Sequence, residues 1–225
     1  IVPALVAAWD GTANSNPLKA RLAEPVAALR GWDLRFGAES IPTSVAIAYG
    51  DTLLSQIADA ADQAGVDVYD YMAAGASATV KLGALADAVT RLEEDFGSWA
   101  TPWGEINRFQ RLTGDIVQPF DDEGASVPVG FTSARWGSLA AYGQRTFNGT
   151  KRIYGTRGNS FVAVVAFGDS VRARAVSAGG QSGDPSSPHF ADQIERYATG
   201  DLRTVRFYRP DVDAVAEETY RPGGR

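Results

Sequence analysis

Apolar residues recur at helical spacing throughout the first half of the chain, most clearly between residues 77 and 96. The apolar positions of that stretch form one stripe, made of Val80, Leu82, Leu85, Val89, Leu92 and Phe96. Its charged residues are expected on the opposite face and are Lys81, Asp87, Arg91, Glu93 and Glu94. The pattern predicts an amphipathic helix that packs through its apolar stripe.

Two further helices are predicted upstream. One covers residues 42–65, and the other starts at the cap and first-turn pair Asn16–Pro17 and ends at Gly31. Because Pro25 has no amide donor, it is expected either to kink this helix or to mark its real start. After Gly97, a turn is expected to lead into a short amphipathic segment over residues 105–111.

The second half changes to the pattern of strands. Residues 159–167 and 171–176 flank the connection Gly168–Asp169–Ser170 and predict a β-hairpin. The first of these strands is apolar at nearly every position, which is typical of a strand buried on both faces. A helix from Pro188 to Gly200, a strand over residues 204–208 and a last helix from Asp211 to Thr219 are expected to follow.

The chain is therefore expected to have an α+β fold with no linker that divides it. Residues 1–114 are mainly helical, residues 115–158 are rich in turn formers, and residues 159–225 contain the hairpin and its capping helices. With 44% hydrophobic residues and 21% charged residues, the 225-residue chain has the composition of a globular protein.

Charge and composition exclude several classes of partner. The net charge is −6 and no run of Lys or Arg exceeds two residues, so a nucleic-acid partner is not expected. No apolar run approaches the roughly 20 residues that cross a bilayer, and residues 1–9 lack the basic flank of a signal peptide. The absence of cysteine excludes disulfides, thiolate metal sites and thiol nucleophiles.

The most distinctive motif is residues 179–193, where a glycine-rich turn precedes the only histidine, His189. Three interpretations compete. The glycines could cradle a phosphate, although no lysine follows and Asp184 would repel an anion. Ser182 and His189 could form a hydrolase pair, although Gly180 lies one place too early for a Gly-x-Ser-x-Gly elbow and the spacing selects neither Asp184 nor Asp192 as the third member. The third interpretation is that the motif is structural.

A metal site has little support in the sequence. One histidine and no cysteine leave carboxylates and carbonyls, which favour calcium or magnesium. Residues 10–16 resemble a calcium loop but lack acidic residues at alternate positions and a closing glutamate, so a turn and helix cap is expected there.

Together with the strands before it, the 179–193 motif resembles the C-terminal part of the β chain of the penicillin acylase family. This family of N-terminal nucleophile hydrolases includes acyl-homoserine-lactone and aculeacin-type acylases. The resemblance covers mainly residues 152–222, with weaker support at residues 7–11, 29–33 and 103–108. It implies an αββα sandwich, in which two antiparallel sheets lie between helical layers.

The resemblance also implies where the chemistry lies. In this family an N-terminal serine is the nucleophile, its α-amine is the base, and an asparagine helps to stabilise the oxyanion. Ile1 cannot be that nucleophile and the only methionine is Met72, so the chain is expected to be a processed product or a piece of a larger polypeptide. The nucleophilic serine and oxyanion asparagine are expected upstream, which leaves no catalytic residue in this chain.

The resemblance implies a structural role for the motif residues Gly180, Gln181, Ser182, Pro188, His189, Asp192 and Gln193. Asn107, Asn159 and Gln181 are the polar residues considered as neighbours of the active site. The implied partners are the α chain, the upstream part of the β chain and a small amide such as an N-acyl-homoserine lactone, a lipopeptide or a penicillin. The implied location is periplasmic or secreted; no cofactor is expected, and any structural calcium would have its ligands outside this segment.

Two alternatives remain open at this stage. The chain could be a non-catalytic module that binds a ligand or partner through aromatic-rich loops, around Trp99, Trp103, Phe120, Phe131 and Trp136. It could also be a serine hydrolase with Ser182 as its own nucleophile.

Overall fold

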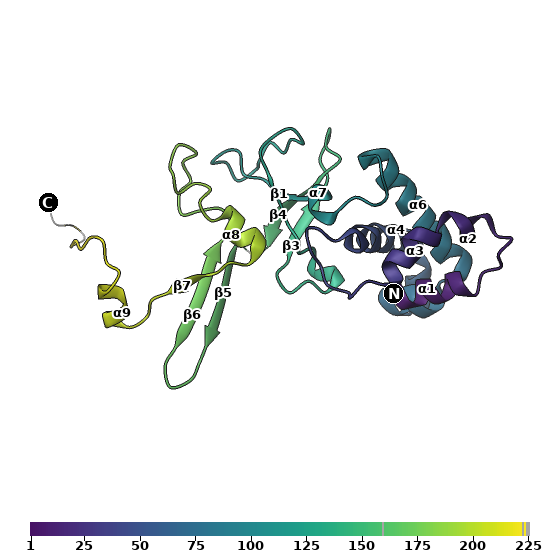
Figure 1. Ribbon diagram of the computed structural model, residues 1–225, viewed down its shortest axis with the longest axis horizontal. Helices are drawn as coiled ribbons and strands as arrows, with labels where there is room; N and C mark the ends of the chain where they lie inside the picture. Colours follow the sequence, from purple (N-terminus) through teal and green to yellow (C-terminus); the bar gives the residue numbers. More distant parts are fainter. Residues whose placement is uncertain (159, 222, 224–225) are drawn as a thin grey trace.

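The first half of the chain folds into a group of helices at one end of the molecule (Figure 1). The computed structural model describes residues 1–158, 160–221 and 223. The helical elements of this half are α1 (Val2–Asp10), α2 (Pro17–Arg21), α3 (Ala23–Arg30), α4 (Ile41–Ala64), α5 (Val68–Asp70), the π-helical turn η1 (Tyr71–Gly75), α6 (Ala78–Phe96) and α7 (Trp103–Ile106). The helices expected at residues 42–65 and 77–96 are α4 and α6.

Short polar side chains and glycines set the ends of these helices. The side chains of Ser40 and Ser77 accept hydrogen bonds from the first-turn amides of α4 and α6, and Gly65 and Gly97 end these helices in the left-handed conformation. The helix expected from Asn16 to Gly31 is divided at Leu22 into α2 and α3. Pro25 lies in the first turn of α3, where a missing amide breaks no intrahelical bond, so it marks a helix start.

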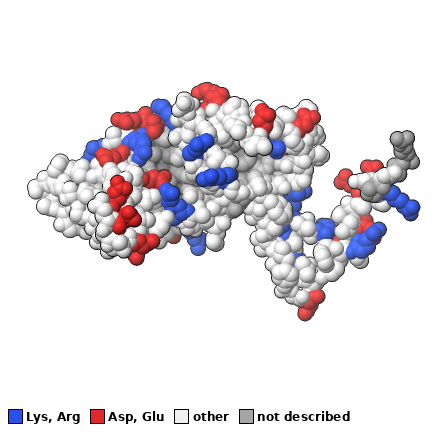
Figure 2. Space-filling view, turned by 180° about the vertical axis from the view of Figure 1, so that it is seen from behind, with Lys and Arg blue, Asp and Glu red and all other residues white. Residues whose placement is uncertain are grey.

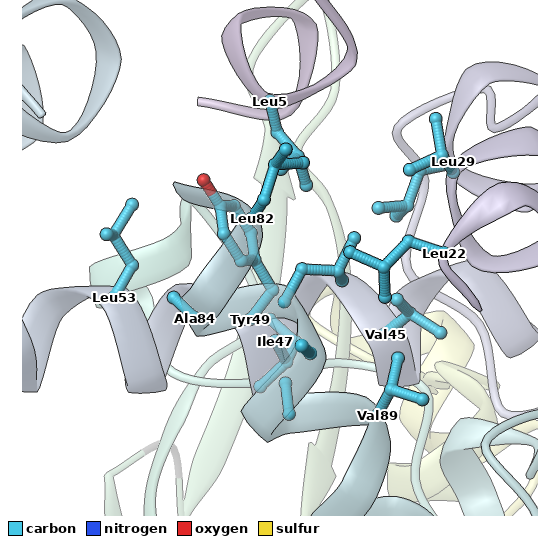
Figure 3. Close-up of a cluster of buried hydrophobic side chains, with 14 of the residues drawn as sticks. Leu5, Leu22, Leu29, Val45, Ile47, Tyr49, Leu53, Leu82, Ala84 and Val89 are labelled. Carbon is cyan, nitrogen blue, oxygen red and sulfur yellow. The ribbon is translucent and has the colours of Figure 1, made fainter. Parts of the chain in front are cut away.

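The core of this half lies between α4 and α6 and is closed by α1 and α3. Figure 3 shows Leu5, Tyr49 and Leu82, which come from three different helices, in one cluster of buried side chains. All three have essentially no exposed surface. Since burying one large apolar side chain contributes about 2 kcal/mol, this cluster is the main source of stability in the helical half.

Lys81 is a correction to the sequence-based pattern. It was expected on the polar face of α6, but its residue is only 6% exposed, whereas Val80 is 37% exposed. The Lys81 ammonium donates to the carbonyl of Ala73 in η1 at 2.8 Å, and burial lowers its pKa. The contact is made by a turn that precedes α6, so the helical period alone could not reveal it.

The second half contains two small sheets. The first has the order β2-β1-β4-β3 and consists of β1 (Asn107–Phe109), β2 (Val127–Pro128), β3 (Tyr142–Arg145) and β4 (Ile153–Gly158). Only the β1–β4 pair in this sheet is parallel. The second sheet, β5-β6-β7, is antiparallel and consists of β5 (Phe161–Ala166), β6 (Arg172–Ser177) and β7 (Arg203–Val205). The β5–β6 hairpin and the α+β class are therefore confirmed.

Several expected boundaries are wrong. The segment 105–111 begins as the end of α7 and continues as strand β1. The loop-rich region 115–158 also contains β2, the 3-10 turn η2 (Ala134–Trp136), β3 and β4, whose strands are too short and polar to show a clear alternation. The expected helix from Pro188 is turns up to Gln193, followed by α8 (Ile194–Thr199). The last helix, α9 (Arg209–Asp213), starts and ends earlier than expected.

Strand β5 was expected to be buried on both faces, and in this chain it is not. Phe161 is 64% exposed and Val164 is 59% exposed, and their side chains, three positions apart, point to opposite faces of the strand. The β5-β6-β7 sheet projects away from the helical half, and α9 lies beyond it (Figure 1). Helix α8 packs against β6, whereas β5 lies at one edge of the sheet and has exposed side chains on both faces. Residues 159, 222, 224 and 225, which include the expected strand start and tail, lie outside the described residues.

Replacing Gly155 by alanine is expected to destabilise the chain by about 2 kcal/mol. A Cβ atom at this position in β4 would lie 1.7 Å from Cε2 of the Tyr142 ring, which crosses the strand there. Urea unfolding followed by tryptophan fluorescence measures the effect. Gly168→Ala is the control, since the nearest atom to its new Cβ would be 4.0 Å away. Equal free energies of unfolding for the two variants would contradict this packing.

Candidate functional site

A cleft of about 550 Å³ lies where the end of β1, strand β4 and the start of the glycine-rich turn meet. We call it the aromatic cleft. Its lining residues are Phe109, Gln110, Arg111, Asp115, Ile116, Val117, Gln118, Phe120, Tyr142, Arg145, Phe147, Gly155, Thr156, Arg157, Gly158, Ser160, Ser177, Ala178, Gly179, Gly180 and Tyr197. The cleft thus brings together segments from residues 109 to 197 and includes the first two glycines of the sequence motif.

Stacked aromatic rings form the walls of the cleft. Phe120 stacks on Phe147 with ring centroids 4.4 Å apart, and on Tyr154 at 5.1 Å. Tyr197, which also lines the cleft, packs against Phe109 with ring centroids 5.5 Å apart. Such contacts fix the ring positions in addition to burying apolar area, so the cleft offers a preformed apolar surface.

The two tyrosines of the cleft remain protonated near neutral pH. Burial raises the pKa of Tyr197 to about 12. Burial also raises the pKa of Tyr142 above its ordinary value, and its hydroxyl donates to Oδ1 of Asn107 at 2.6 Å. Neither phenol is therefore available as a general base, because a catalytic base has a pKa close to the working pH.

Asn107, at the junction of α7 and β1, has no exposed surface and uses its whole side-chain amide within the fold. Its Nδ2 donates to the carbonyls of Val129 and Phe131, both at 2.8 Å, while Oδ1 accepts from Tyr142. These bonds leave no Asn107 group to stabilise an oxyanion. Asn159, the second asparagine considered, lies outside the described residues.

Arg111, which follows β1, holds the glycine-rich turn against the sheet. Its guanidinium donates to the carbonyl of Phe190 at 2.5 Å and to that of Ser182 at 2.9 Å, and it lies 4.1 Å from the centroid of the Phe190 ring. No pattern in the sequence indicates this contact, because 71 and 79 residues separate Arg111 from its partners. Arg111 therefore couples one wall of the cleft to the 179–193 motif.

The turn itself depends on a close backbone approach at Gly180. A Cβ atom there would lie 2.0 Å from the carbonyl oxygen of His189, so only glycine fits. The same oxygen accepts from the amide of Ser182 at 3.1 Å. Because this side of the turn is filled by carbonyl oxygens, it is not a cradle for a phosphate.

Ser182 and His189 do not form a nucleophile and base pair. Nδ1 of His189 lies 3.0 Å from Oδ2 of Asp192, and the histidine side chain is 66% exposed. The Ser182 hydroxyl accepts instead from the amide of Asp184 at 3.1 Å. Within the described part of the chain, no hydrogen bond joins Ser182 to His189, so the geometry gives no support to the serine hydrolase interpretation.

The remaining motif residues make local contacts. Nε2 of Gln181 donates to the Ser177 hydroxyl at 3.1 Å. Gln193 is 2% exposed. Its side-chain Oε1 accepts from the backbone amide of Ser177 at 3.1 Å, and its backbone amide donates to the carbonyl of Gly179 at 2.9 Å. Pro188 lies in an exposed turn. A structural role for the motif agrees with these contacts and stays a prediction.

The region around residues 10–16 forms a turn and a helix cap, as expected. Asp10 pairs with Arg30 at 2.6 Å, and the hydrogen bond from Arg30 lowers the pKa of Asp10. Oδ1 of Asn16 accepts from the amide of Leu18 at the start of α2. Over residues 1–158, 160–221 and 223, no group of three or more histidine, aspartate or glutamate side chains is placed to hold a metal ion.

The aromatic loops do not form one binding surface. Trp103 is 1% exposed in the helical core, and Trp136 lies over Gly50 and donates to Asp51 at 3.1 Å. Phe131 packs edge-on against Tyr142. Of the five aromatic residues in that hypothesis, Phe120 is the one that lines the cleft.

The chain has a helical first half, followed by mostly antiparallel sheets and a glycine-rich turn. A match to a family model defines its class as a segment of an N-terminal nucleophile hydrolase. The penicillin amidase family model matches residues 1–214, and the chain belongs to that family. The solved structures include a similar chain, the thermostable penicillin G acylase from Alcaligenes faecalis. It is 16% identical, with a TM-score of 0.45, over 98% of this chain and 45% of that one. The chain thus spans less than half the length of that acylase.

Among the described residues, no helix is long and apolar enough to cross a membrane.

Replacing Gly180 by alanine is expected to destabilise the chain by about 2 kcal/mol or more, because the new Cβ would collide with a backbone oxygen rather than a flexible side chain. The matched control is Gly183→Ala, three residues later, where a Cβ meets nothing within 4 Å. Its free energy of unfolding should stay within about 0.5 kcal/mol of the parent. Thermal and urea unfolding measure both, and a neutral Gly180→Ala would show that the turn is built differently.

Proposed function

We propose that this chain is the C-terminal segment of an amidohydrolase that cleaves linear amides through an acyl-enzyme on an N-terminal serine outside residues 1–225. The observation that carries the proposal is the penicillin amidase family match over residues 1–214. In the proposed reaction the serine oxygen attacks the amide carbonyl, the amine leaves with a proton, and water then releases the acid. The serine α-amine would accept and return the proton.

The chemistry of the described residues supports a non-catalytic role for this chain in the reaction. The cleft tyrosines stay protonated, Asn107 is fully hydrogen-bonded, and His189 has no nucleophile beside it. What the chain contributes is a fixed apolar surface of stacked rings. We therefore expect the isolated chain to be inactive.

The exposed β5-β6-β7 sheet supports the proposal of upstream partners, namely the α chain and the N-terminal part of the β chain. Its exposed large apolar residues are Phe161, Val164, Val165 and Val205. Covering such surface contributes about 25 cal/mol per Å². The remaining proposals follow the family: an N-acyl-homoserine lactone, lipopeptide or penicillin-type substrate, a periplasmic or secreted location, and a structural calcium, if present, bound outside this segment.

The native particle that contains this chain tests the proposal. Purification with an antibody against the chain, followed by native mass measurement and N-terminal sequencing of every polypeptide, should show an N-terminal serine, either on the polypeptide that includes this segment or on a second polypeptide of the same particle. The particle should hydrolyse at least one amide from a panel of the three substrate classes. Replacing that serine by alanine should abolish hydrolysis, with a loss of at least about a thousandfold in kcat.

The separately purified chain is the control and should give no hydrolysis. Activity from this chain alone would overturn the proposal, and Ser182→Ala would then show whether Ser182 is the nucleophile. A lone, folded and inactive monomer of 23.9 kDa in the native source would favour a ligand-binding module built around the aromatic cleft.

A further inference from the structure

A second hollow, of about 480 Å³, adjoins the aromatic cleft and differs from it in chemistry. Three arginines, Arg135, Arg145 and Arg157, line it, so we call it the arginine pocket. Arg145, Thr156 and Arg157 line both hollows, so the two share these residues of the β3–β4 pair. Figure 2 shows basic side chains over the central part of the molecule, next to a helical end where acidic side chains gather.

Two of the arginines are held by their surroundings. Arg157 lies across Gly143 of β3, where a Cβ would be 2.9 Å from Cγ of Arg157. The guanidinium of Arg145 lies 4.6 Å from the centroid of the Phe147 ring, which is itself part of the cleft wall. Stacking on an aromatic face leaves the in-plane N–H groups of an arginine free to bind an anion.

The three arginines give the pocket a positive charge. In the part of the chain that the structure describes, none of the three forms a salt bridge. Asp51 is the acidic residue of the pocket, and its Oδ1 already accepts from Nε1 of Trp136 at 3.1 Å. The pocket therefore has an excess of positive charge in a molecule whose net charge is −6.

We propose that the two hollows together bind an amphipathic organic carboxylate, with its apolar body in the aromatic cleft and its carboxylate at Arg145 and Arg157. A guanidinium matches a carboxylate through two parallel hydrogen bonds, and the adjoining rings bury a linear or aromatic chain. The binding site is inferred from the hollows themselves. Its assignment to the acid that amide cleavage releases, or to an acid-bearing substrate, rests on the proposed function.

Titration calorimetry tests the binding in the particle in which the chain is purified, whether alone or with a partner segment. The probes are octanoate, the neutral octanol and inorganic phosphate, all at low ionic strength. Octanoate should bind at least about tenfold more tightly than octanol or phosphate. Only octanoate has both an alkyl chain for the aromatic cleft and a carboxylate for the arginines. Arg157→Gln and Arg145→Gln should each weaken octanoate about tenfold or more, since each removes a charge-assisted hydrogen bond.

The matched control is Arg172→Gln, an exposed arginine of β6 that lines neither hollow, and it should change octanoate affinity less than about twofold. Equal binding of octanol, or unchanged octanoate binding in both arginine variants, would overturn the proposal. Tighter binding of phosphate than of octanoate would reduce the pocket to an inorganic anion site and overturn it too. Calorimetry does not depend on turnover, so octanoate binding without amide hydrolysis would refute the proposed function alone.

Discussion

The buried amide of Asn107 is the constraint that joins the parts of this molecule. It lies at the point where α7 of the helical half becomes β1 of the first sheet. Its side chain bonds the segment at residues 129–131 and the hydroxyl of Tyr142 on β3. A buried polar group that loses one partner costs about 1–3 kcal/mol. The three bonds therefore hold two strands and a loop in one arrangement, and the cleft wall formed by Tyr142 depends on them.

The sequence predicted the elements whose signals are local. Serine caps, glycine stops and a 3.6-residue period define α4 and α6. An apolar strand and an alternating strand around a short turn define the β5–β6 hairpin. Contacts between distant segments were not predictable. Lys81 is buried because η1 supplies a carbonyl, and residues 107–109 are a strand because β4 pairs with them more than 40 residues later. Helix α8 starts late because the residues before it pack against the glycine-rich turn: the Gln193 amide donates to the carbonyl of Gly179, and the His189 carbonyl lies against Gly180.

The candidate site also has one part that the sequence predicts and one part that it does not. The 179–193 motif could be found in the sequence and led to the family, since a glycine-rich turn with one following histidine is distinctive. The aromatic cleft could not, because its walls come from residues scattered between 109 and 197. Arg111 connects the 179–193 motif to the aromatic cleft. It follows β1 in the sequence, yet its hydrogen bonds determine where the motif lies relative to the cleft.

The distribution of burial connects the fold to the proposed function. The largest buried side chains are concentrated in the helical half, with Tyr154 of β4 as an exception, whereas β5 and β7 are largely exposed. An edge strand with free backbone groups and an apolar face gains most from an added strand or sheet. Under the proposed function, that addition would come from the segment that carries the nucleophile. Completion of the sheet and assembly of the active site would then be one event, because the segment that buries β5 would also supply the nucleophilic serine.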